Sequence, residues 1–522
     1  GHIYDRYGEE LAGSIESASV YVHPTFVRSK SRTAFQISKI LNIKHNEVLK
    51  KISQKKTFVW IARQIPEEIG NKIRKLKLPG VGVIAEPKRY YPQGTLAAQL
   101  LGFVGTDGQG LEGIELAFDA HLRGEKFVFH GLADALGTPM LDPYRSSLRR
   151  SGSSLVLTLD KSLQYLAERE IEQTVEEFVA QRGLIIIMNP HLGEIVALAQ
   201  FPSFNPNFFY KSAPFAWKNV ALTDVFEPGS TFKTFLVAQA IESRLMKETD
   251  KFFCENGKLK VANKVIGEAS GHQYGLLSVA DILKYSSNIG AAKIAMKLGK
   301  EKYYNSILQF GFGEKTGIQF PSETSGIVRP PKLWSQVDLT TAAFGQGVSV
   351  SPLQLITAFS ALANGGYLMK PYVVKEIVNR EGEKLEETQP IRKRQVLSAQ
   401  TLQTLNKMLI RVTEEGGTAS NIRVPYFSIA GKTGTAQKPS TDGRGYSGKY
   451  ISSFLGYFPA EQPQYSMLVM IDEPLKHYYA STVAVPAFKR LTQEIVRLYA
   501  KDFQEFVLNE QTTRMKWPPS IP

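Results

Sequence analysis

The sequence predicts a multidomain protein of mixed α+β and α/β structure. Its 522 residues exceed what one hydrophobic core usually takes, so two or three domains are expected. Short strand-like runs dominate residues 1–150, whereas strand-like runs on both sides of a long helical stretch follow from residue 152. We therefore expect a mixed, β-rich N-terminal domain at 1–150, an α/β domain at 151–505 and a loose C-terminal tail at 506–522.

The first domain contains few helical patterns. Its strand-like runs are Ser19–His23, Gly82–Ala85 and Lys126–His130, and its one helical stretch is the basic segment Pro66–Leu78. No long helix with periodic apolar residues is evident here, and turn signals are frequent. These features predict a small mixed α+β or β-rich module.

The second domain begins with a helix and a hairpin. Apolar residues recur at close to helical spacing within Asp160–Ala180, and the apolar run Leu184–Met188 follows directly. A turn at Pro190–Gly193 then joins this run to a second strand that ends near Ala199. The pattern predicts one helix followed by two antiparallel strands.

Helices fill the middle of this domain and strands return at its end. The expected helices are Ser230–Leu245, Val279–Tyr285, Ala291–Leu298 and Leu353–Leu362, the strands are Ser428–Ala436, Tyr450–Phe458 and Tyr465–Ile471, and the last helix is Thr482–Tyr499. Because strands occur at both ends and helices lie between them, we expect a single α/β domain.

Charge and cysteine content exclude several classes of protein. The net charge of +14 favours an anionic neighbourhood such as a membrane surface or an acidic polymer. The charges form no arginine-rich arm and no aromatic-interleaved motif, so we expect no nucleic-acid partner. Cys254 is the only cysteine, which excludes an intrachain disulfide and a thiolate metal cage. The eight histidines form no metal-binding motif, so no metal site is expected.

No segment reaches the about 18–20 apolar residues of a membrane span. The chain also lacks a signal peptide and opens abruptly with Gly-His-Ile-Tyr-Asp-Arg-Tyr-Gly. We interpret this opening as that of a truncated chain.

Three short motifs carry the chemistry, and they occur in a fixed order. They are Ser230-Thr-Phe-Lys233, Ser286-Ser-Asn288 and Lys432-Thr-Gly-Thr435. The first two are weak alone, because Ser53-Gln-Lys-Lys56 and Ser203-Phe-Asn205 repeat their patterns elsewhere. Lys-Thr-Gly-Thr is much rarer, and the order of the three motifs on helix, loop and strand strengthens the signal.

Ser230 and Lys233 form the candidate nucleophile and base. Pro228 is suited to a helix start, which places Ser230 in the first turn, where free N–H groups favour a developing negative charge. Lys233 shares a helix face with Ser230. If burial lowers its pKa, Lys233 can act as general base toward the Ser230 hydroxyl. The simpler interpretation, which is the better one for an isolated Ser-x-x-Lys, is a helix cap beside a surface lysine.

Ser286 and Asn288 lie at the end of a helical stretch, before Ile289 and Gly290. A hydroxyl here can relay a proton to a leaving amine, and the asparagine side chain can hold a substrate amide. Without the other two motifs, a polar turn that ends a helix is an equally good interpretation.

Lys432-Thr-Gly-Thr435 is expected on a strand. Alternation sends Lys432 and Gly434 to one face and Thr433 and Thr435 to the other. Gly434 lets a substrate chain lie against the strand, and Lys432 with the threonine hydroxyls can bind a terminal carboxylate. The backbone N–H groups of Ser230 and Thr435 are the oxyanion-hole candidates. The alternative is a Lys/Thr-rich edge strand without chemistry.

These motifs resemble those of the penicillin-binding proteins, specifically the monofunctional class B type, and the resemblance covers nearly the whole chain. In the first domain it rests on Gly1–Ala12, Lys88-Arg-Tyr-Tyr-Pro92, Leu101-Gly-Phe-Val-Gly105 and Gly113-Ile-Glu115. These segments resemble the start of the chain after the family's single N-terminal membrane anchor and its non-catalytic pedestal, or dimerisation-like, domain. Tyr7 stands where the family usually has Asn, and Gln99 where it often has His.

In the second domain the resemblance implies a penicillin-binding, serine β-lactamase-like fold, with a central antiparallel sheet flanked by helices. It rests on Leu157-Thr-Leu-Asp160, Asn189-Pro-His-Leu-Gly-Glu194, Phe204-Asn-Pro-Asn207, Asp224–Lys233, Gly345-Gln-Gly347 and Ser351-Pro-Leu-Gln354. By position, Ser230, Lys233, Ser286, Asn288 and Lys432 inherit catalytic roles, and Thr433, Gly434 and Thr435 substrate-binding roles.

The resemblance implies a D-Ala-D-Ala transpeptidase that cross-links peptidoglycan stem peptides. Ser230 would form an acyl-enzyme, which the side-chain amine of a neighbouring stem would intercept. β-Lactam antibiotics would acylate the same serine and leave slowly. Neither a metal nor an organic cofactor would be needed, and Lys233 is the preferred acylation base.

Within class B, Ser-Ser-Asn and Leu132-Ala-Asp-Ala-Leu-Gly137 look more like the septal, cell-division type than the elongation type. This resemblance implies a membrane glycan polymerase and divisome proteins as partners of the 1–150 domain. It also implies a protein anchored in the inner membrane through a segment missing from this chain, with its catalytic domain in the periplasm.

Related functions fit the sequence less well. Class A β-lactamases use a glutamate in a Glu-x-x-Leu-Asn loop, and here only Gln403-Thr-Leu-Asn406 is similar. A D,D-carboxypeptidase stays open, because water would merely replace the acceptor amine. A β-lactam sensor would lack the pedestal pattern, and a bifunctional polymerase would need a larger N-terminal domain.

Overall fold

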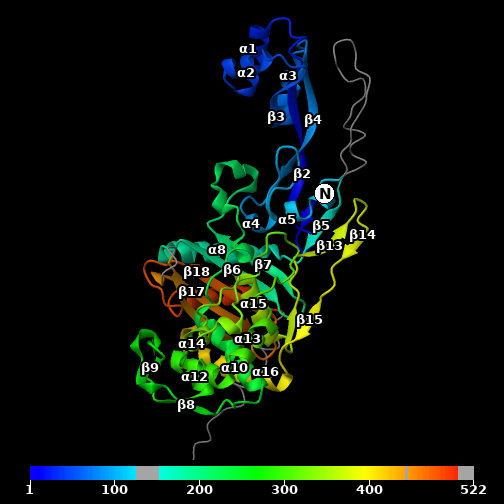
Figure 1. Ribbon diagram of the computed structural model, residues 1–522. Coiled ribbons are helices and arrows are strands. Elements are labelled where there is room, and N and C mark those ends of the chain that lie inside the picture. The colour runs from blue at the N-terminus through cyan, green and yellow to red at the C-terminus, as the bar shows by residue number, and fades with distance from the viewer. Residues whose placement is uncertain (125–151, 441–444, 502, 504–522) are drawn as a thin grey trace, which may run out of the picture. The chain divides into compact units, whose positions relative to one another are not determined.

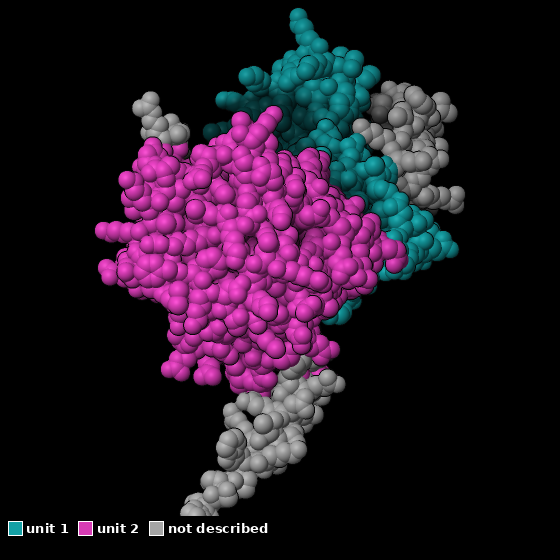
Figure 2. All heavy atoms as spheres, turned by 60° about the horizontal axis from the view of Figure 1, so that its bottom comes forward, with its two compact units in different colours: residues 1–157, 204–213, 374–387 teal, residues 158–203, 214–373, 388–522 magenta. Residues whose placement is uncertain are grey.

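The computed structural model describes residues 1–124, 152–440, 445–501 and 503. Its two compact units are Gly1–Leu157 with Phe204–Ala213 and Val374–Glu387 (unit 1), and Thr158–Ser203 with Pro214–Val373 and Thr388–Pro522 (unit 2; Figure 2). The expected domain boundary at 150/151 and the expected tail at 506–522 lie outside the described residues. The strand expected at Lys126–His130 and the stretch Leu132–Gly137 lie outside them as well.

Unit 1 is built on a seven-stranded mixed sheet (Figure 1). The strands are β1 (Ile3–Tyr4), β2 (Glu10–Val22), β3 (Val59–Ile65), β4 (Val81–Tyr90), β5 (Ser154–Leu157), β13 (Val374–Val378) and β14 (Lys384–Glu387). Their order is β14-β13-β5-β1-β2-β3, and β4 also pairs with β2. Only the β1–β5 pair is parallel among these strands. Strands from three distant parts of the chain therefore share one sheet.

The helices of unit 1 are short. Within the described residues they are α1 (Lys30–Leu41), α2 (His45–Ile52), α3 (Glu67–Lys75), α4 (Ala98–Leu101), α5 (Gly113–Ala117) and α6 (Asp119–Leu122). The prediction of a basic helix at Pro66–Leu78 is confirmed by α3, but α1 and α2 were not predicted. Both pack on a core that includes Ile37 and Ile52 from the helices and Val20 from β2.

A buried ion pair joins two of the pedestal motifs. Arg89 Nε lies 2.6 Å from Glu115 Oε1, and the Tyr91 hydroxyl donates to the same oxygen at 3.2 Å. The Glu115 side chain is 2% exposed. Buried charges persist only when they are paired and hydrogen-bonded. These motif residues therefore have a structural role within unit 1.

Unit 2 is built on a five-stranded antiparallel sheet in the order β16-β17-β18-β6-β7. The strands are β6 (Arg182–Asn189), β7 (Glu194–Phe201), β16 (Ala430–Pro439), β17 (Tyr446–Phe458) and β18 (Tyr465–Asp472). The early hairpin thus pairs with the three late strands. The predicted fold class, a central antiparallel sheet flanked by helices, is confirmed.

Helices cover both faces of this sheet. The helices in the described part of unit 2 are α8 (Lys161–Phe178), α9 (Val220–Thr223), α10 (Lys233–Glu242), α11 (Val279–Tyr285), α12 (Asn288–Leu298), α13 (Lys300–Gln309), α14 (Gln336–Ala342), α15 (Pro352–Ser360), α16 (Ala399–Thr413) and α17 (Ala484–Leu498). Phe454 of β17 contacts Phe488 of α17, whereas Tyr457 of β17 contacts Phe359 of α15. Since successive strand residues alternate between faces, α15 and α17 lie on opposite faces.

Three two-stranded ribbons complete the part of unit 2 that the structure describes. They are β8 (Lys251–Phe253) with β11 (Leu276–Ser278), β9 (Lys258–Val261) with β10 (Lys264–Gly267), and β12 (Tyr367–Met369) with β15 (Arg392–Gln395). The first two lie between α10 and α11 in the chain, and the Ser-Ser-Asn motif follows α11.

Candidate active site

Ser230 lies in a single turn of 3-10 helix, Gly229–Phe232, that leads directly into α10. The Gly345-Gln-Gly347 loop packs against this turn. Gly345 has φ +76°, and a Cβ there would lie 2.3 Å from the carbonyl oxygen of Gly229. Only glycine fits such a close backbone approach. The Gly347 N–H also donates to the Glu227 carboxylate at 2.7 Å.

The Lys233 amine is fully buried and reaches three residues of two motifs. Its Nζ lies 3.0 Å from Ser230 Oγ, 2.6 Å from the Ser286 carbonyl oxygen, 3.2 Å from Ser286 Oγ and 2.7 Å from Asn288 Oδ1. Burial lowers the pKa of Lys233 to about 7, and the negative charge of Glu268 partly opposes this shift. A large fraction of the amine is therefore neutral near pH 7.

The second motif forms the turn between α11 and α12. Ser286 ends α11 in the left-handed conformation (φ +59°), and Ser287 caps α12 by accepting the Gly290 N–H at 2.9 Å. Left-handed backbone is uncommon for residues other than glycine and clusters at functional sites. Asn288 Nδ2 donates to the carbonyl oxygen of Gly267 at 3.0 Å, so both ends of this amide have partners within the protein.

Lys432 on β16 approaches Ser286 from the sheet. Its Nζ lies 2.9 Å from Ser286 Oγ and 3.2 Å from the Thr433 carbonyl oxygen. The Lys432 side chain is fully buried. Burial, followed by the positive charge of Lys233, holds its pKa well below the usual range.

The expected alternation along β16 is present. A Cβ on Gly434 would lie 2.5 Å from Ser453 Oγ and 2.8 Å from Thr231 Cγ2, so this face of the strand packs against the Gly229–Phe232 turn. On the other face, Thr433 Oγ1 lies 2.9 Å from Thr418 Oγ1, and Thr435 Oγ1 accepts the Ala480 N–H at 3.2 Å. Gly434 thus allows the strand and the turn to approach closely.

The repeated serine motifs have other surroundings. Ser53 is the C-cap residue of α2 in unit 1, where its N–H donates to the Leu49 carbonyl oxygen at 2.9 Å. Ser203 follows β7 and directly precedes the unit boundary. The contacts described above join Ser230, rather than either of these serines, to the other two motifs.

One residue of the site was missed by the sequence analysis. The Glu268 carboxylate accepts hydrogen bonds from the Asn288 N–H at 2.6 Å and from the Ser287 hydroxyl. It precedes Asn288 by 20 residues and belongs to no motif. The sequence around Glu268 has no periodic pattern that would predict its position. That position depends instead on how the two short ribbons, β8 with β11 and β9 with β10, fold.

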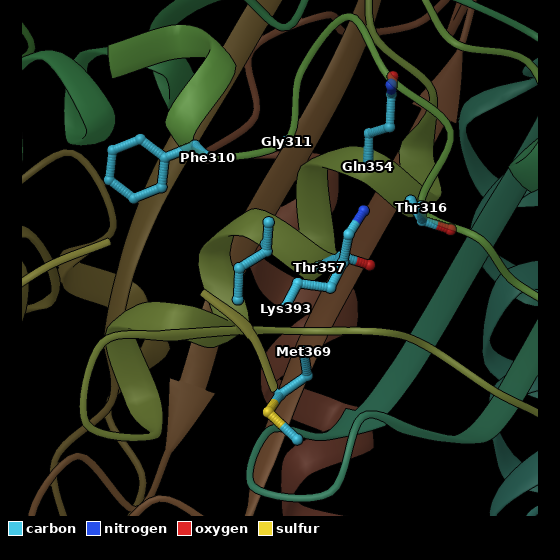
Figure 3. Close-up of a pocket in the computed structure, with 8 residues that line it drawn as sticks. Phe310, Gly311, Thr316, Gln354, Thr357, Met369 and Lys393 are labelled. Carbon is cyan, nitrogen blue, oxygen red and sulfur yellow. The ribbon is translucent and has the colours of Figure 1, made fainter. Parts of the chain in front are cut away.

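A narrow recess elsewhere in unit 2 involves another family motif. Figure 3 shows it, and its lining residues are Phe310, Gly311, Thr316, Gln354, Thr357, Leu368, Met369 and Lys393. Gln354 closes a capping box with Ser351 at the start of α15 and donates to the carbonyl oxygens of Glu314 and Ser325. Ser351-Pro-Leu-Gln354 therefore connects α15 to the preceding loop.

The fold and these contacts define a protein with a Ser–Lys pair at the edge of an antiparallel sheet. The model of the penicillin-binding protein transpeptidase domain matches residues 183–493, and that of the penicillin-binding protein dimerisation domain matches residues 1–157. The chain belongs to the penicillin-binding protein family, and the prediction of a class B member is confirmed.

Curated relatives align with this chain over almost its whole length. Stage V sporulation protein D of Bacillus subtilis is 35% identical over 93% of this chain and 76% of the relative. Probable peptidoglycan D,D-transpeptidase PenA of Neisseria meningitidis is 32% identical over 94% of this chain and 83% of the relative. Peptidoglycan D,D-transpeptidase FtsI of Escherichia coli is 30% identical over 98% of this chain and 87% of the relative.

None of the helices in the described ranges is long and apolar enough to cross a membrane. Within the same ranges, no three His, Cys, Asp or Glu side chains form a group that could hold a metal ion.

Proposed function

We propose that this protein is a serine-type D-Ala-D-Ala transpeptidase that cross-links peptidoglycan stem peptides through an acyl-enzyme on Ser230. The family membership supports this assignment, as do the names of two relatives, probable peptidoglycan D,D-transpeptidase PenA and peptidoglycan D,D-transpeptidase FtsI. β-Lactams, which resemble the D-Ala-D-Ala end of the stem, would acylate the same serine.

One observation carries the proposal: the hydrogen bonds of Lys233 direct its lone pair at the nucleophile. A neutral amine has two hydrogens and one lone pair. The Ser286 carbonyl oxygen (2.6 Å) and Asn288 Oδ1 (2.7 Å) can only accept, so they take both hydrogens. The lone pair is then available to the Ser230 hydroxyl at 3.0 Å. This is the geometry that a general base requires.

During acylation, one proton moves from Ser230 to Lys233 and then to the leaving amine. Lys233 takes the hydroxyl proton as Ser230 Oγ bonds to the carbonyl carbon of the penultimate D-Ala. The N–H groups of Ser230 and Thr435 stabilise the tetrahedral oxyanion. The C–N bond to the terminal D-Ala breaks, and the proton passes from Lys233 through the Ser286 hydroxyl to the leaving amine.

Cross-linking reverses these roles. The acceptor amine of a second stem attacks the ester carbonyl and loses a proton to Lys233, which returns it to Ser230 Oγ as the ester bond breaks. Lys432, Thr433 and Thr435 bind the carboxylate of the donor stem before the first step, and Gly434 keeps the strand close to the nucleophile turn. No cofactor enters either step.

We place this activity in septal wall synthesis. FtsI and PenA are similar to this chain over most of their length. The division role implies that a membrane glycan polymerase and divisome proteins bind the 1–150 domain. It also implies an N-terminal membrane anchor ahead of this chain and a periplasmic catalytic domain.

Intact-protein mass spectrometry with benzylpenicillin tests the assignment. We expect one stable adduct on the peptide that contains Ser230, and its complete loss in Ser230→Ala. Ser53→Ala, which changes the other Ser-x-x-Lys, is the matched control and should label normally. Stoichiometric labelling of folded Ser230→Ala would refute the assignment.

The lifetime of the adduct and the products separate the related activities. Rapid loss with hydrolysed drug would indicate a β-lactamase. Release of D-Ala from a stem peptide without transfer to an added acceptor amine would indicate a carboxypeptidase.

A further inference from the structure

A buried carboxylate outside the three motifs lies at the N-terminus of α12. Glu268 follows β10 and is 9% exposed. Its Oε1 accepts from the Ser287 hydroxyl and from the Ile289 N–H at 3.3 Å, and its Oε2 accepts from the Asn288 N–H at 2.6 Å. The carboxylate therefore binds three consecutive residues, two of which belong to the Ser-Ser-Asn motif.

The same segment also fixes the Asn288 side chain. Asn288 Nδ2 donates to the carbonyl oxygen of Gly267, the residue before Glu268, while Asn288 Oδ1 accepts from Lys233. The amide is thus held in the orientation that presents oxygen, rather than nitrogen, to the lysine. A rotated amide would present N–H to Lys233 and compete for its lone pair.

We propose that Glu268 is a positioning residue for acyl transfer, which fixes the Ser286–Asn288 turn so that Lys233 keeps its lone pair directed at Ser230. This inference rests on the proposed function, because it assigns Glu268 a part in the same reaction. Glu268 does not touch the reacting atoms in this arrangement and acts through Asn288 and Ser287.

A structural cap alone would predict a loss of stability, whereas a positioning charge also predicts an altered pH dependence. Burial lowers the pKa of Lys233, and the Glu268 charge raises it. Lys432 is the titratable amine that faces Lys233 from β16, and burial and the charge of Lys233 hold its pKa well below the usual range. Burial raises the pKa of the Cys254 thiol and of the Tyr274 phenol, and the Glu268 charge acts in the same direction. Both groups are therefore neutral near pH 7, and they do not compensate for a lost carboxylate charge.

The test compares the second-order rate of benzylpenicillin acylation in Glu268→Gln and in the unsubstituted chain from pH 5.5 to 9. Glutamine has nearly the same size but lacks the charge. Its amide NH2 group would also face backbone N–H groups, from which it cannot accept a hydrogen bond. We expect the plateau rate to fall about 10-fold or more, as small misplacements of reacting groups cause. We also expect the midpoint of the pH profile to move to lower pH, because the Lys233 pKa falls further.

Two variants serve as controls. Glu268→Asp keeps the charge on a shorter side chain, so it should keep the original midpoint, with a rate between the other two. Glu255→Gln removes a nearby carboxylate that pairs with Lys293 instead, and both rate and midpoint should stay unchanged. Thermal melting of each variant reports whether the fold is intact.

The outcomes separate this inference from the proposed function. If the unsubstituted chain forms no adduct on Ser230, the proposed function itself fails. If it does and folded Glu268→Gln acylates at the same rate and midpoint, Glu268 is not a positioning residue. A lower melting temperature with an unchanged midpoint would also overturn the inference, because the residue would only stabilise the fold. Should Glu268→Gln not fold, a Glu268→Asp variant with full rate would refute it.

Discussion

At the residue scale, one serine hydroxyl lies between two buried lysines. Ser286 Oγ is 3.2 Å from Lys233 Nζ and 2.9 Å from Lys432 Nζ. Burial penalises both ammonium ions, and the charge of Lys233 lowers the pKa of Lys432 further. The pair therefore carries fewer protons at neutral pH than two exposed lysines would, and Ser286 is placed to move a proton through the site.

The pH dependence of acylation follows from the Lys233 amine. Burial lowers its pKa to about 7, and only the neutral amine can take the Ser230 proton. The acylation rate with benzylpenicillin should therefore rise with pH through about 7 and then level off. At pH 6 it should be about 10-fold below the plateau, because about one amine in ten is neutral there. Stopped-flow or quenched-flow labelling across this range measures the profile.

A surface lysine supplies the control for this profile. Lys449 on β17 is 57% exposed and pairs with Glu473, so Lys449→Ala should leave the midpoint where it is. A rate that stays flat from pH 5.5 to 9 would contradict Lys233 as the base.

The motif residues could be predicted from the sequence because each motif combines residue type with spacing. The contacts that orient them could not. Asn288 finds the carbonyl oxygen of Gly267 across 21 residues, and Glu268 reaches the same turn from the end of β10. These partners depend on how two short ribbons fold, which no local pattern encodes. The catalytic roles of the motif residues stay predictions until labelling tests them.

At the scale of elements, α8 depends on one cap. The Asp160 carboxylate accepts from the N–H groups of Ser162 and Leu163 at 2.9 and 3.0 Å, and it also accepts from the Tyr499 hydroxyl. Asp160→Ala should lower the free energy of unfolding by about 1–2 kcal/mol. In a unit of more than 300 residues, that lowers the melting temperature by about 1–2 °C per kcal/mol, which calorimetry measures.

Asp160→Asn is the matched control, because the amide oxygen still accepts from the first turn of the helix. It should recover most of the stability. Benzylpenicillin acylation should be unchanged in both variants, because Asp160 contacts none of the motif residues in the described hydrogen bonds. An Asp160→Ala protein as stable as the unsubstituted chain would show that this cap is dispensable.

The missed helices of unit 1 lack such local signals. Ser29 precedes α1 and Lys44 precedes α2, and neither side chain makes a capping hydrogen bond. Both helices are also short, with 12 and 8 residues, so few apolar residues recur in each. Burial of residues such as Ile37 and Ile52 against the strands stabilises these helices. This is tertiary packing, which sequence periodicity predicts poorly. In unit 2, Asp160–Ala180 has both the cap and the periodicity, and its prediction is confirmed by α8.

At the scale of the whole molecule, the chain enters unit 1 three times. β5 pairs with β1 on one side and with β13 on the other, and Ile3 and Leu155 are fully buried at the first of these pairings. β13 follows β5 by more than 200 residues. A sequence read in order assigns β13 and β14 to the second domain, because nothing local to them indicates a partner so far away.

This interleaving predicts the behaviour of a fragment that begins at residue 151. Without β1, strand β5 becomes an exposed sheet edge, and unpaired edges promote association between chains. The fragment should melt at a lower temperature than the full chain and self-associate in size-exclusion chromatography with light scattering. Its monomer should still acylate Ser230, because the contacts among the three motifs lie within unit 2.

A second fragment tests whether the orphaned strand is the cause. It begins at Thr158 and replaces Val374–Glu387 with a short flexible linker. The linker can span the gap because Gln319 binds both ends of the excised segment, accepting from the Val373 N–H at 3.1 Å and donating to Thr388 Oγ1 at 3.2 Å. With β5, β13 and β14 removed together, no unpaired edge from this sheet remains, so the second fragment should be monomeric. Equal association of both fragments would place the cause elsewhere than in the β5 edge.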